Sequence, residues 1–515
     1  MNRSRPLFSA RWTRPRSLAI ALAGGAILAP GLLAQDENAD DEQIFELDAY
    51  VVTSGIRDSL AAGVELKKES PQMLDAIVAE DIGKFPDNNV VEALQRVPGI
   101  QTTGRTRGEV STVTIRGFND IATTVNGRNI FTGAGRSVAL ADIPASLLYR
   151  VDVFKTRAAS QLEQGIAGVI DIKTQRPFYF NDERTVVVAR GIYSELADEI
   201  NPVISGLYTN TFETDFGRIG FLINASYART DWTDKSITAG AQVPFVTENP
   251  PSEFGFVPLE RMFTTHPSAQ ENPLWQPGLE SGLPFAPGST LPLTPVGSDT
   301  TVQVPYYLAR DAVFTADFYG QRERPAINAV LQWEPSDDAT YTMEVFYNGY
   351  REDWQNNLQF SFADWWGNPG EFTLFEGTNI IKERSLLFPY MFMSGDMTVQ
   401  STDSFVYALN ADWKIGDDLR ITADLSYQTS EFETEFQGIR TDRVPYSITV
   451  DFNDDGGVPG WAFGDDPATA DVDESSLTDP SLWNVAQFYD NAGYNEGDAI
   501  EFKVDGTYRP DAIEM

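Results

Sequence analysis

Leu419-Arg420-Ile421-Thr422-Ala423-Asp424-Leu425-Ser426-Tyr427-Gln428-Thr429-Ser430 is the stretch that decides the fold of this chain. Apolar side chains occupy its odd positions as far as Tyr427, and polar side chains occupy its even positions. Successive side chains of a β-strand point to opposite faces, so the stretch predicts a strand with one apolar and one polar face. The preceding stretch, 405–414, alternates in the same way, and Lys414 to Asp418 join the two. The pair is therefore predicted to form an antiparallel hairpin.

The same pattern recurs from residue 184 to the end of the chain. It predicts strands at about 184–194, 203–212, 217–230, 321–334, 339–351, 403–414, 419–431 and 498–509. The short connections are 213–216, 335–338, 415–418 and 510–511, and the long ones cover about 231–320, 352–402 and 432–497. In a membrane barrel every second connection lies on the same side, so the segregation predicts short periplasmic turns and long extracellular loops.

Aromatic residues support this register. One group stands just before the short turns and the other stands toward the long loops, as two interfacial girdles would require. The first group is Phe212, Trp333, Trp413 and Tyr508, and the second is Tyr227, Tyr347 and Tyr427. The alternative is a large soluble all-β protein, whose strands also alternate but which does not account for the parity of loop length.

The N-terminus and the composition indicate an exported protein. Five arginines within the first 16 residues precede an apolar stretch from Leu18 to Leu33, which predicts a signal peptide over residues 1–34. A net charge of −37 argues against nucleic acid as a partner. The chain has no cysteine and no run of 18 apolar residues, so neither disulfides nor a membrane helix are expected.

Two segments separate the signal peptide from the strands. Residues 35–63 form an acidic linker with a short extended segment, Tyr50-Val51-Val52-Thr53. Residues 64–178 mix helix and strand patterns. A helix with Val91, Leu94 and Val97 on its apolar face is expected to stop at Pro98-Gly99, and Asn126-Gly127 predicts a hairpin turn.

Several short motifs follow one another in a fixed order over residues 49–178. They are Val51-Val52-Thr53, Asp81-Ile82-Gly83-Lys84-Phe85-Pro86-Asp87, Glu92 to Ile100, Thr114-Ile115-Arg116-Gly117-Phe118, Val125-Asn126-Gly127-Arg128, Val151 to Lys155 and Gly165-Ile166-Ala167-Gly168. With these motifs the segment resembles the plug domain of TonB-dependent outer-membrane receptors, and more narrowly the branch described from Xanthomonas- and Caulobacter-type bacteria.

The resemblance implies an α+β plug domain over residues 64–178, followed at 179–515 by an incomplete antiparallel transmembrane β-barrel of about eight strands. It implies a place in the outer membrane, surrounded by lipid, and active import of a scarce solute. The segment Tyr50-Val51-Val52-Thr53 would be pulled by TonB as an added strand. The plainer interpretation is that this segment is the first edge strand of the plug.

Two plug motifs carry arginines that could contact the barrel wall. Arg116 with Gly117, and Arg128 with Asn126 and Gly127, are expected to face wall carboxylates or to shape tight turns. An ion pair inside the plug, or a solvated arginine, is an equally good interpretation of each. Family members close a barrel of twenty-two strands, and eight strands cannot enclose a plug. We therefore expect this chain to be the N-terminal portion of a longer receptor.

The connection predicted at 352–402 is rich in tryptophan. Trp354, Asp364, Trp365 and Trp366 are candidate ligand-binding residues, because indole faces beside carboxylates suit sugar rings. Relatives in the resembled branch take up carbohydrates, so an oligosaccharide is the expected solute. Packing of the loop itself is the plainer interpretation. A siderophore or iron complex is the alternative solute, and a non-transporting surface binding protein is the alternative class.

No catalytic, metal or cofactor site is expected. The acidic stretch Asp451 to Gly456 resembles the start of a calcium loop, but its twelfth position is Ala462 instead of glutamate. His266 is the single histidine, which argues against zinc and against histidine-based acid–base chemistry. Carboxylate pairs are too common in so acidic a chain to nominate a surface hydrolase.

Overall fold

The computed structural model describes residues 63–508 with short gaps. The gaps are 69, 79–89, 96, 107–108, 135–139, 141–142, 145–146, 159–160, 162–164, 181, 263–282, 365–369, 417 and 470. The predicted signal peptide and the segment Tyr50-Val51-Val52-Thr53 lie outside the described residues. Across the described ranges, no helix has both the length and the apolar character needed to cross a membrane.

The N-terminal domain is a small α+β unit. Its five-stranded sheet has the order β1 (Leu74–Val78), β6 (Leu148–Phe154), β7 (Gly168–Thr174), β4 (Ile121–Val125), β5 (Arg128–Asn129). A separate hairpin joins β2 (Ile100–Thr106) to β3 (Glu109–Ile115), and α2 (Val90–Leu94) precedes it. All these pairings are antiparallel except β4 with β7.

The core of this domain is formed by the residues whose pattern predicted it. Val91 and Leu94 of α2 are completely buried, and Val97 is 5% exposed. They pack in one cluster with buried valines and isoleucines of β6 and β7. Three residues of strands outside this domain belong to the same cluster, namely Ala326, Phe346 and Val406. The apolar core of the domain therefore continues onto the long sheet.

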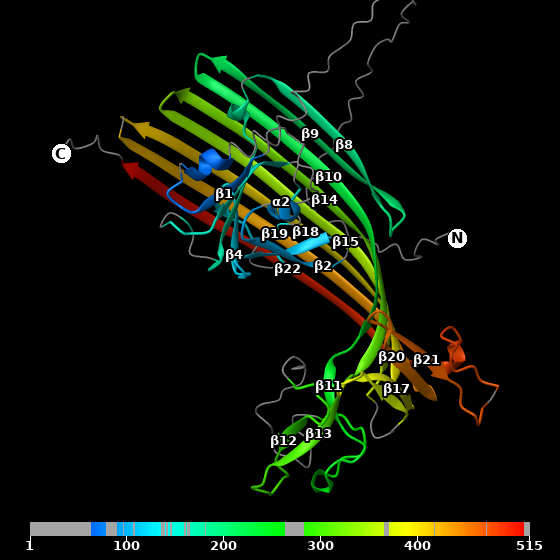
Figure 1. Ribbon diagram of the computed structural model, residues 1–515. Coiled ribbons are helices and arrows are strands. Elements are labelled where there is room, and N and C mark those ends of the chain that lie inside the picture. Colours follow the sequence, from blue (N-terminus) through cyan, green and yellow to red (C-terminus); the bar gives the residue numbers. More distant parts are fainter. Residues whose placement is uncertain are drawn as a thin grey trace, which may run out of the picture. The chain divides into compact units, whose positions relative to one another are not determined.

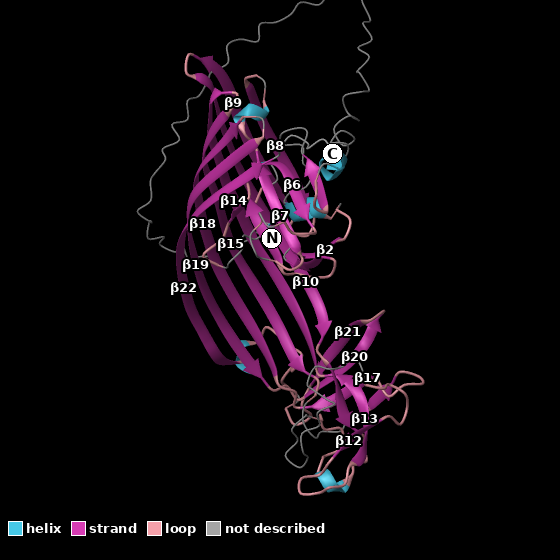
Figure 2. Cartoon of the chain, turned by 90° about the vertical axis from the view of Figure 1, so that its left-hand side faces the viewer, coloured by secondary structure: helices cyan, strands magenta, loops and turns pink. Residues whose placement is uncertain are grey.

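The long sheet contains eight antiparallel strands, side by side in Figure 1 and Figure 2. Their order from one edge to the other is β8 (Arg184–Ser194), β9 (Glu199–Thr214), β10 (Gly217–Ala239), β14 (Ala312–Ser336), β15 (Ala339–Phe362), β18 (Met391–Ile415), β19 (Leu419–Arg443) and β22 (Asn484–Tyr508). The predicted fold class, an α+β domain followed by an antiparallel sheet of about eight barrel-type strands, is confirmed.

The two faces of the long sheet differ as the alternation predicts. Register places Phe346 opposite Val406, and both contact the N-terminal domain. We call this side the inner face. On the opposite, outer face, Met343 and Leu409 are paired and are about half exposed, at 51% and 55%. A face of exposed apolar side chains requires an apolar environment.

The predicted strands are too short at their loop ends. The strand predicted at 339–351 continues to Phe362, and the one predicted at 419–431 continues to Arg443. Beyond Ser430 the alternation reverses, with Glu431, Glu433 and Glu435 at the odd-numbered positions of the outer face and Phe432 and Phe436 at even-numbered positions. The backbone ladder with neighbouring strands nevertheless holds the chain extended, a long-range effect that the local pattern does not contain. Trp354 was consequently assigned to a loop incorrectly, because it lies within β15.

The long connections fold into a distal lobe of two small sheets. One has the order β11 (Gln242–Val246), β13 (Val302–Arg310), β12 (Thr290–Leu293), and the other β16 (Phe372–Leu374), β17 (Ile381–Leu387), β20 (Ser447–Asp455), β21 (Val458–Gly464). A buried cluster joins them through Phe245, Ile381 and Ile448. The acidic stretch around Asp451 belongs to the β20–β21 hairpin. The described residues contain no group of three or more candidate metal ligands.

Candidate functional site

The hairpin between β4 and β5 carries the first part of the candidate site. Asn126 and Gly127 both have positive φ, 53° and 80°, and Val125 pairs with Arg128 across them. Two successive positive φ values define the type I′ turn that the Asn-Gly sequence favours. The turn places Asn126 and Arg128 next to each other at the tip of the hairpin.

Arg128 joins this hairpin to the inner face of the long sheet. Its Nε donates to Asp424 Oδ1 at 2.8 Å and its Nη2 to Asp424 Oδ2 at 2.7 Å. Its Nη1 donates to Glu344 Oε2 at 2.6 Å. The side chain is only 4% exposed. Burial alone would lower the pKa of Arg128, but its bonds to Asp424 and the charges of Glu344 and Asp424 raise the pKa above its usual value. The guanidinium therefore stays charged and holds both carboxylates.

Asn126 completes the contact. Its Nδ2 donates to Glu344 Oε1 at 2.7 Å and to Thr174 Oγ1 at 2.9 Å, and Thr174 Oγ1 donates to the same Glu344 oxygen at 3.0 Å. The Gly127 amide donates to Asp171 Oδ1 at 2.9 Å. Glu344 is thus surrounded by donors of the N-terminal domain, which satisfies a carboxylate that is 2% exposed.

Arg116 lies elsewhere. It has a φ of 53°, Gly117 follows with 84°, and Ile115 bridges to Phe118, so the pair forms a second tight turn. The Arg116 amide donates to the Gly99 carbonyl at 2.9 Å. Its exposed side chain reaches Met73 of the same domain. Of the two arginines predicted to face wall carboxylates or to shape turns, the structure brings only Arg128 to a wall carboxylate.

Further along the inner face lies a second buried ion pair. Arg322 Nη2 donates to Glu352 Oε1 at 2.6 Å, and Gln400 Nε2 donates to the other oxygen at 2.8 Å. Two positions beyond Glu352 on β15, Trp354 is half-buried and packs on Phe318 with ring centroids 6.2 Å apart.

An aromatic group covers the inner face nearer the distal lobe, and we call Phe314, Phe360, Phe392 and Tyr390 the inner aromatic cluster. Phe360 stacks on Phe314 at 5.7 Å and on Phe392 at 5.0 Å between centroids. Arg440 lies 3.7 Å above the Phe392 ring, and its Nη2 donates to the Tyr390 hydroxyl at 3.2 Å. Tyr390 in turn donates to Asp442 Oδ2 at 3.1 Å. Ring faces thus lie beside a cation, a hydroxyl and a carboxylate.

The local sequence pattern does not reveal the inner aromatic cluster. Phe360 and Phe392 share the even-numbered inner parity of Glu344 on β15 and of Val406 on β18. That parity was readable from the sequence, but only with the strands extended past residue 351, which the local pattern did not justify.

The other predicted ligand residues are placed differently. Asp364 is 4% exposed and accepts a hydrogen bond from Arg261 Nη1 at 2.8 Å in the distal lobe, while Arg261 also pairs with Asp311 at 3.1 Å. The buried carboxylate of Asp364 is therefore already bound by Arg261. Trp365, Trp366 and His266 lie outside the described residues.

Comparisons with known proteins bear on the N-terminal domain and on the sheet. Residues 66–170 match the family model of the TonB-dependent Receptor Plug Domain, a segment that contains the Asn126-Gly127 turn and Arg128. No curated protein matches the chain.

Similar solved structures include one transporter and two receptors named for ferric complexes. The unliganded ferric citrate transporter FecA has 12% identity and a TM-score of 0.30, with 76% of this chain and 64% of that chain covered. The ferric yersiniabactin uptake receptor FyuA of Yersinia pestis has 9% identity and a TM-score of 0.26, with 85% and 62% covered. A mutant of the ferric enterobactin receptor PfeA of Pseudomonas aeruginosa has 13% identity and a TM-score of 0.33, with 77% and 60% covered. The chain spans less than two thirds of the length of each of these structures.

Proposed function

We propose that this chain is part of a TonB-dependent receptor that imports a scarce solute actively across the bacterial outer membrane. The observation that carries the proposal is the buried contact of Arg128, in a segment matching the plug family model, with Glu344 and Asp424 of the long sheet. A domain tied to the inner face of a sheet by charge-assisted hydrogen bonds can block passage and still be released as a unit.

The outer face supports a membrane location. Trp413 lies in one aromatic row with Tyr341 and Trp333, and Phe405 lies in the other with Tyr347. Trp413 and Phe405 are eight residues apart on β18, about 26 Å along the strand. With a strand tilt of about 40°, the two rows are separated by about 20 Å along the membrane normal, which is close to the height of the apolar band of outer-membrane barrels.

Energy coupling is proposed for the segment Tyr50-Val51-Val52-Thr53. A segment with two valines and a threonine, preceded by acidic residues, suits strand addition to TonB, in which backbone hydrogen bonds supply the affinity. The export route through a signal peptide at residues 1–34 and the domain bounds 64–178 and 179–515 belong to the same proposal.

For the solute, we propose a carbohydrate bound over the inner aromatic cluster. Sugar rings stack their C–H faces on aromatic rings, and their hydroxyls bond to groups such as the Tyr390 hydroxyl and the Asp442 carboxylate. Trp354, on the same inner face, would lie on the path between this cluster and the N-terminal domain. Asp364 is not part of the proposed binding surface, since Arg261 already holds its carboxylate.

A siderophore or iron complex is the second candidate, and Arg440 favours it. Its guanidinium lies over Phe392, and its Nε is buried without a hydrogen-bond partner among the described residues. A buried donor beside apolar rings suits an anionic complex with aromatic groups, because an unpaired buried donor is unfavourable without a ligand. The similar structures named for ferric citrate, ferric yersiniabactin and ferric enterobactin uptake carry those solutes in their names.

The test is uptake by cells that express the gene, with radiolabelled oligosaccharides and with iron-loaded siderophores, before and after collapse of the proton gradient. Energised uptake should disappear when Val51→Pro blocks strand addition, while surface binding of the solute remains. Uptake that is indifferent to both treatments would overturn the transporter proposal and favour a surface binding protein.

Single substitutions then separate the two solutes. Phe392→Ala should weaken binding of either solute, and Arg440→Gln should weaken only an anionic complex. Val485→Ala, which changes an exposed apolar residue of β22, is the matched control.

A further inference from the structure

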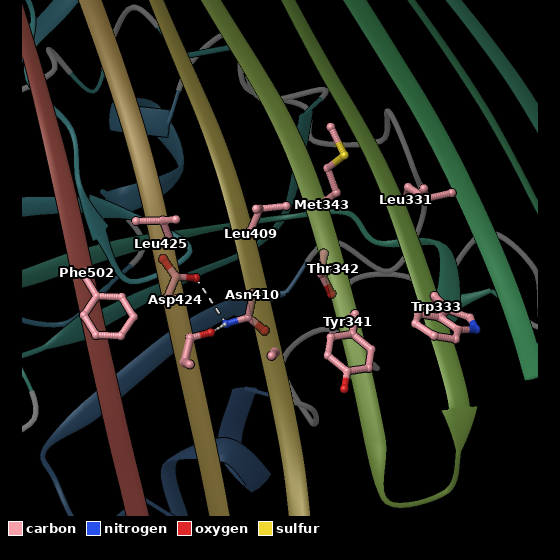
Figure 3. A pocket seen from close by; sticks show the side chains of 12 residues that line it. Leu331, Trp333, Tyr341, Thr342, Met343, Leu409, Asn410, Asp424, Leu425 and Phe502 are labelled. Atoms are coloured by element: carbon pink, nitrogen blue, oxygen red, sulfur yellow. Dashed lines mark hydrogen bonds between the residues drawn. The ribbon is translucent and has the colours of Figure 1, made fainter.

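The outer face of the long sheet contains a cavity of about 360 Å³ lined by β14, β15, β18, β19 and β22 (Figure 3). Ala411 of β18 pairs directly with Ala423 of β19, and these two methyl groups form its floor. Large side chains surround them. Leu409 pairs with Leu425 at one end, where Phe502 pairs with Leu425 in turn, and Tyr341 pairs with Ala411. Two small residues in register between large ones leave a groove the size of a ligand pocket.

The polar side chains near the groove belong to the inner face and bind other protein groups. Asp424 and Asn410 occupy inner-face positions, and Asn410 Nδ2 donates to Asp424 Oδ2 at 3.1 Å (Figure 3). Asp424 is also held by Arg128 of the N-terminal domain. The groove therefore offers apolar surface, and its occupant must be apolar as well.

One end of the groove meets the aromatic row at the short turns. Two residues beyond Ala411, Trp413 pairs with Ile421, and Trp413 Nε1 donates to the Tyr341 hydroxyl at 3.1 Å. The tight turn at Gly416, with φ of 64°, follows. The inference rests on the proposed function, in which the short turns face the periplasm. On that basis the groove lies in the periplasmic half of the membrane, whose leaflet consists of phospholipid.

We propose that this groove binds one acyl chain of a phospholipid of the periplasmic leaflet. The acyl chain packs over Ala411 and Ala423, between Tyr341 and Phe502. The phospholipid headgroup lies level with Trp413, where indole and hydroxyl groups meet the membrane interface. The alternative occupant, an acyl chain of lipopolysaccharide, belongs to the opposite leaflet and would have to enter from the row of Tyr347 and Phe405.

The test is native mass spectrometry of the full chain purified from outer membranes in mild detergent. We expect the wild type to retain one phospholipid, and to take up phosphatidylethanolamine in preference to lipid A after delipidation. The double substitution Ala411→Leu and Ala423→Leu fills the groove, and it should reduce retention by about tenfold, the loss expected from removing several buried methylene contacts. Ala225→Leu, on the outer face of β10, is the matched control and should retain lipid as the wild type does.

If the filled variant and the wild type retain phospholipid equally, the groove is not the binding site. Preferential retention of lipid A would contradict the assignment of the groove to the periplasmic leaflet. Heat-modifiable migration in gel electrophoresis verifies that each variant is folded. Lipid binding requires neither TonB nor solute, so a protein that retains phospholipid but imports nothing would contradict only the transport proposal. A protein that leaves membranes without detergent would contradict the membrane location itself.

Discussion

Arg128 holds Asp424 with two hydrogen bonds, 2.8 Å from Nε to Oδ1 and 2.7 Å from Nη2 to Oδ2, although the residues are 296 positions apart in the sequence. The same guanidinium binds Glu344 at 2.6 Å. A single arginine at the tip of one hairpin therefore fixes the N-terminal domain against two strands of the long sheet. Its loss leaves two carboxylates without their principal cation.

Arg128→Ala is expected to destabilise the folded protein by about 3–5 kcal/mol, because it leaves Glu344 and Asp424 buried without their partner. The measurement is scanning calorimetry in detergent. The N-terminal domain should also become more sensitive to limited proteolysis. The triple substitution Arg128→Met, Glu344→Gln and Asp424→Asn removes all three charges and should recover most of the loss. If Arg128→Ala unfolds as the wild type does, Arg128 does not fix the domain to the sheet.

Gly127→Ala is expected to destabilise the N-terminal domain by about 1–2 kcal/mol, because an L-residue at φ 80° is strained. A Cβ there would meet no atom within 4 Å, so the effect is backbone strain alone. Gly206→Ala is the matched control, since it also meets no atom within 4 Å and lacks a positive φ. Equal thermal stabilities of the two variants would refute the type I′ assignment.

Asp75 links the stability of the N-terminal domain to pH. Burial raises the pKa of Asp75, but hydrogen bonds from Lys155 and Lys67, and their charges, outweigh burial and lower the pKa below its ordinary value of 3.8. The unfolded chain then binds the proton more tightly than the folded one. The stabilisation from Asp75 is fully present above the ordinary pKa and is lost as pH falls through the lower folded value.

Asp75→Asn should therefore reduce stability at neutral pH, and its difference from the wild type should shrink as the pH falls below the ordinary pKa of 3.8. Urea unfolding at pH values above and below that pKa measures the difference. Glu65→Gln is the control, because Glu65 forms only an exposed pair with Lys68. A difference that does not change with pH would exclude the ion pairs of Asp75 as its source.

Asp364 stabilises the distal lobe through charges that are buried with it. Burial raises the pKa of Asp364, and burial lowers the pKa of nearby Arg384 to about 10, with the Asp364 charge opposing that fall. Asp364→Ala leaves Arg261 paired with Asp311 and removes a counter-charge of Arg384. We expect a loss of about 3–5 kcal/mol in lobe stability.

Limited proteolysis of the distal lobe measures this loss, and the tryptic cleavage rate should rise while the long sheet stays intact. Asp364→Asn keeps an acceptor for Arg261 and should show a smaller increase. Asp454→Ala, at the partly exposed β20–β21 hairpin, provides the control. An unchanged cleavage rate in Asp364→Ala would contradict a structural role for this ion pair.

The sequence by itself determined the eight strands of the long sheet, the two faces of their alternating stretches and the Asn126-Gly127 turn. These features are local, because side chains alternate with a period of two along any strand and two positive φ values suit an Asn-Gly pair. The apolar face of α2 was readable for the same reason, since Val91, Leu94 and Val97 lie at helical spacing.

Only the tertiary structure decided where the strands end and which side chains meet. β19 continues to Arg443 because twenty-five-residue neighbours supply its backbone hydrogen bonds, even where the alternation of apolar and polar side chains has reversed. The corresponding extension of β15 places Trp354 on the inner face, and the extensions of β18 and β19 place Phe392 beneath Arg440. The pairing of Arg128 with Asp424 joins residues 296 positions apart, so it depends on how the N-terminal domain packs against the long sheet, which no local pattern records.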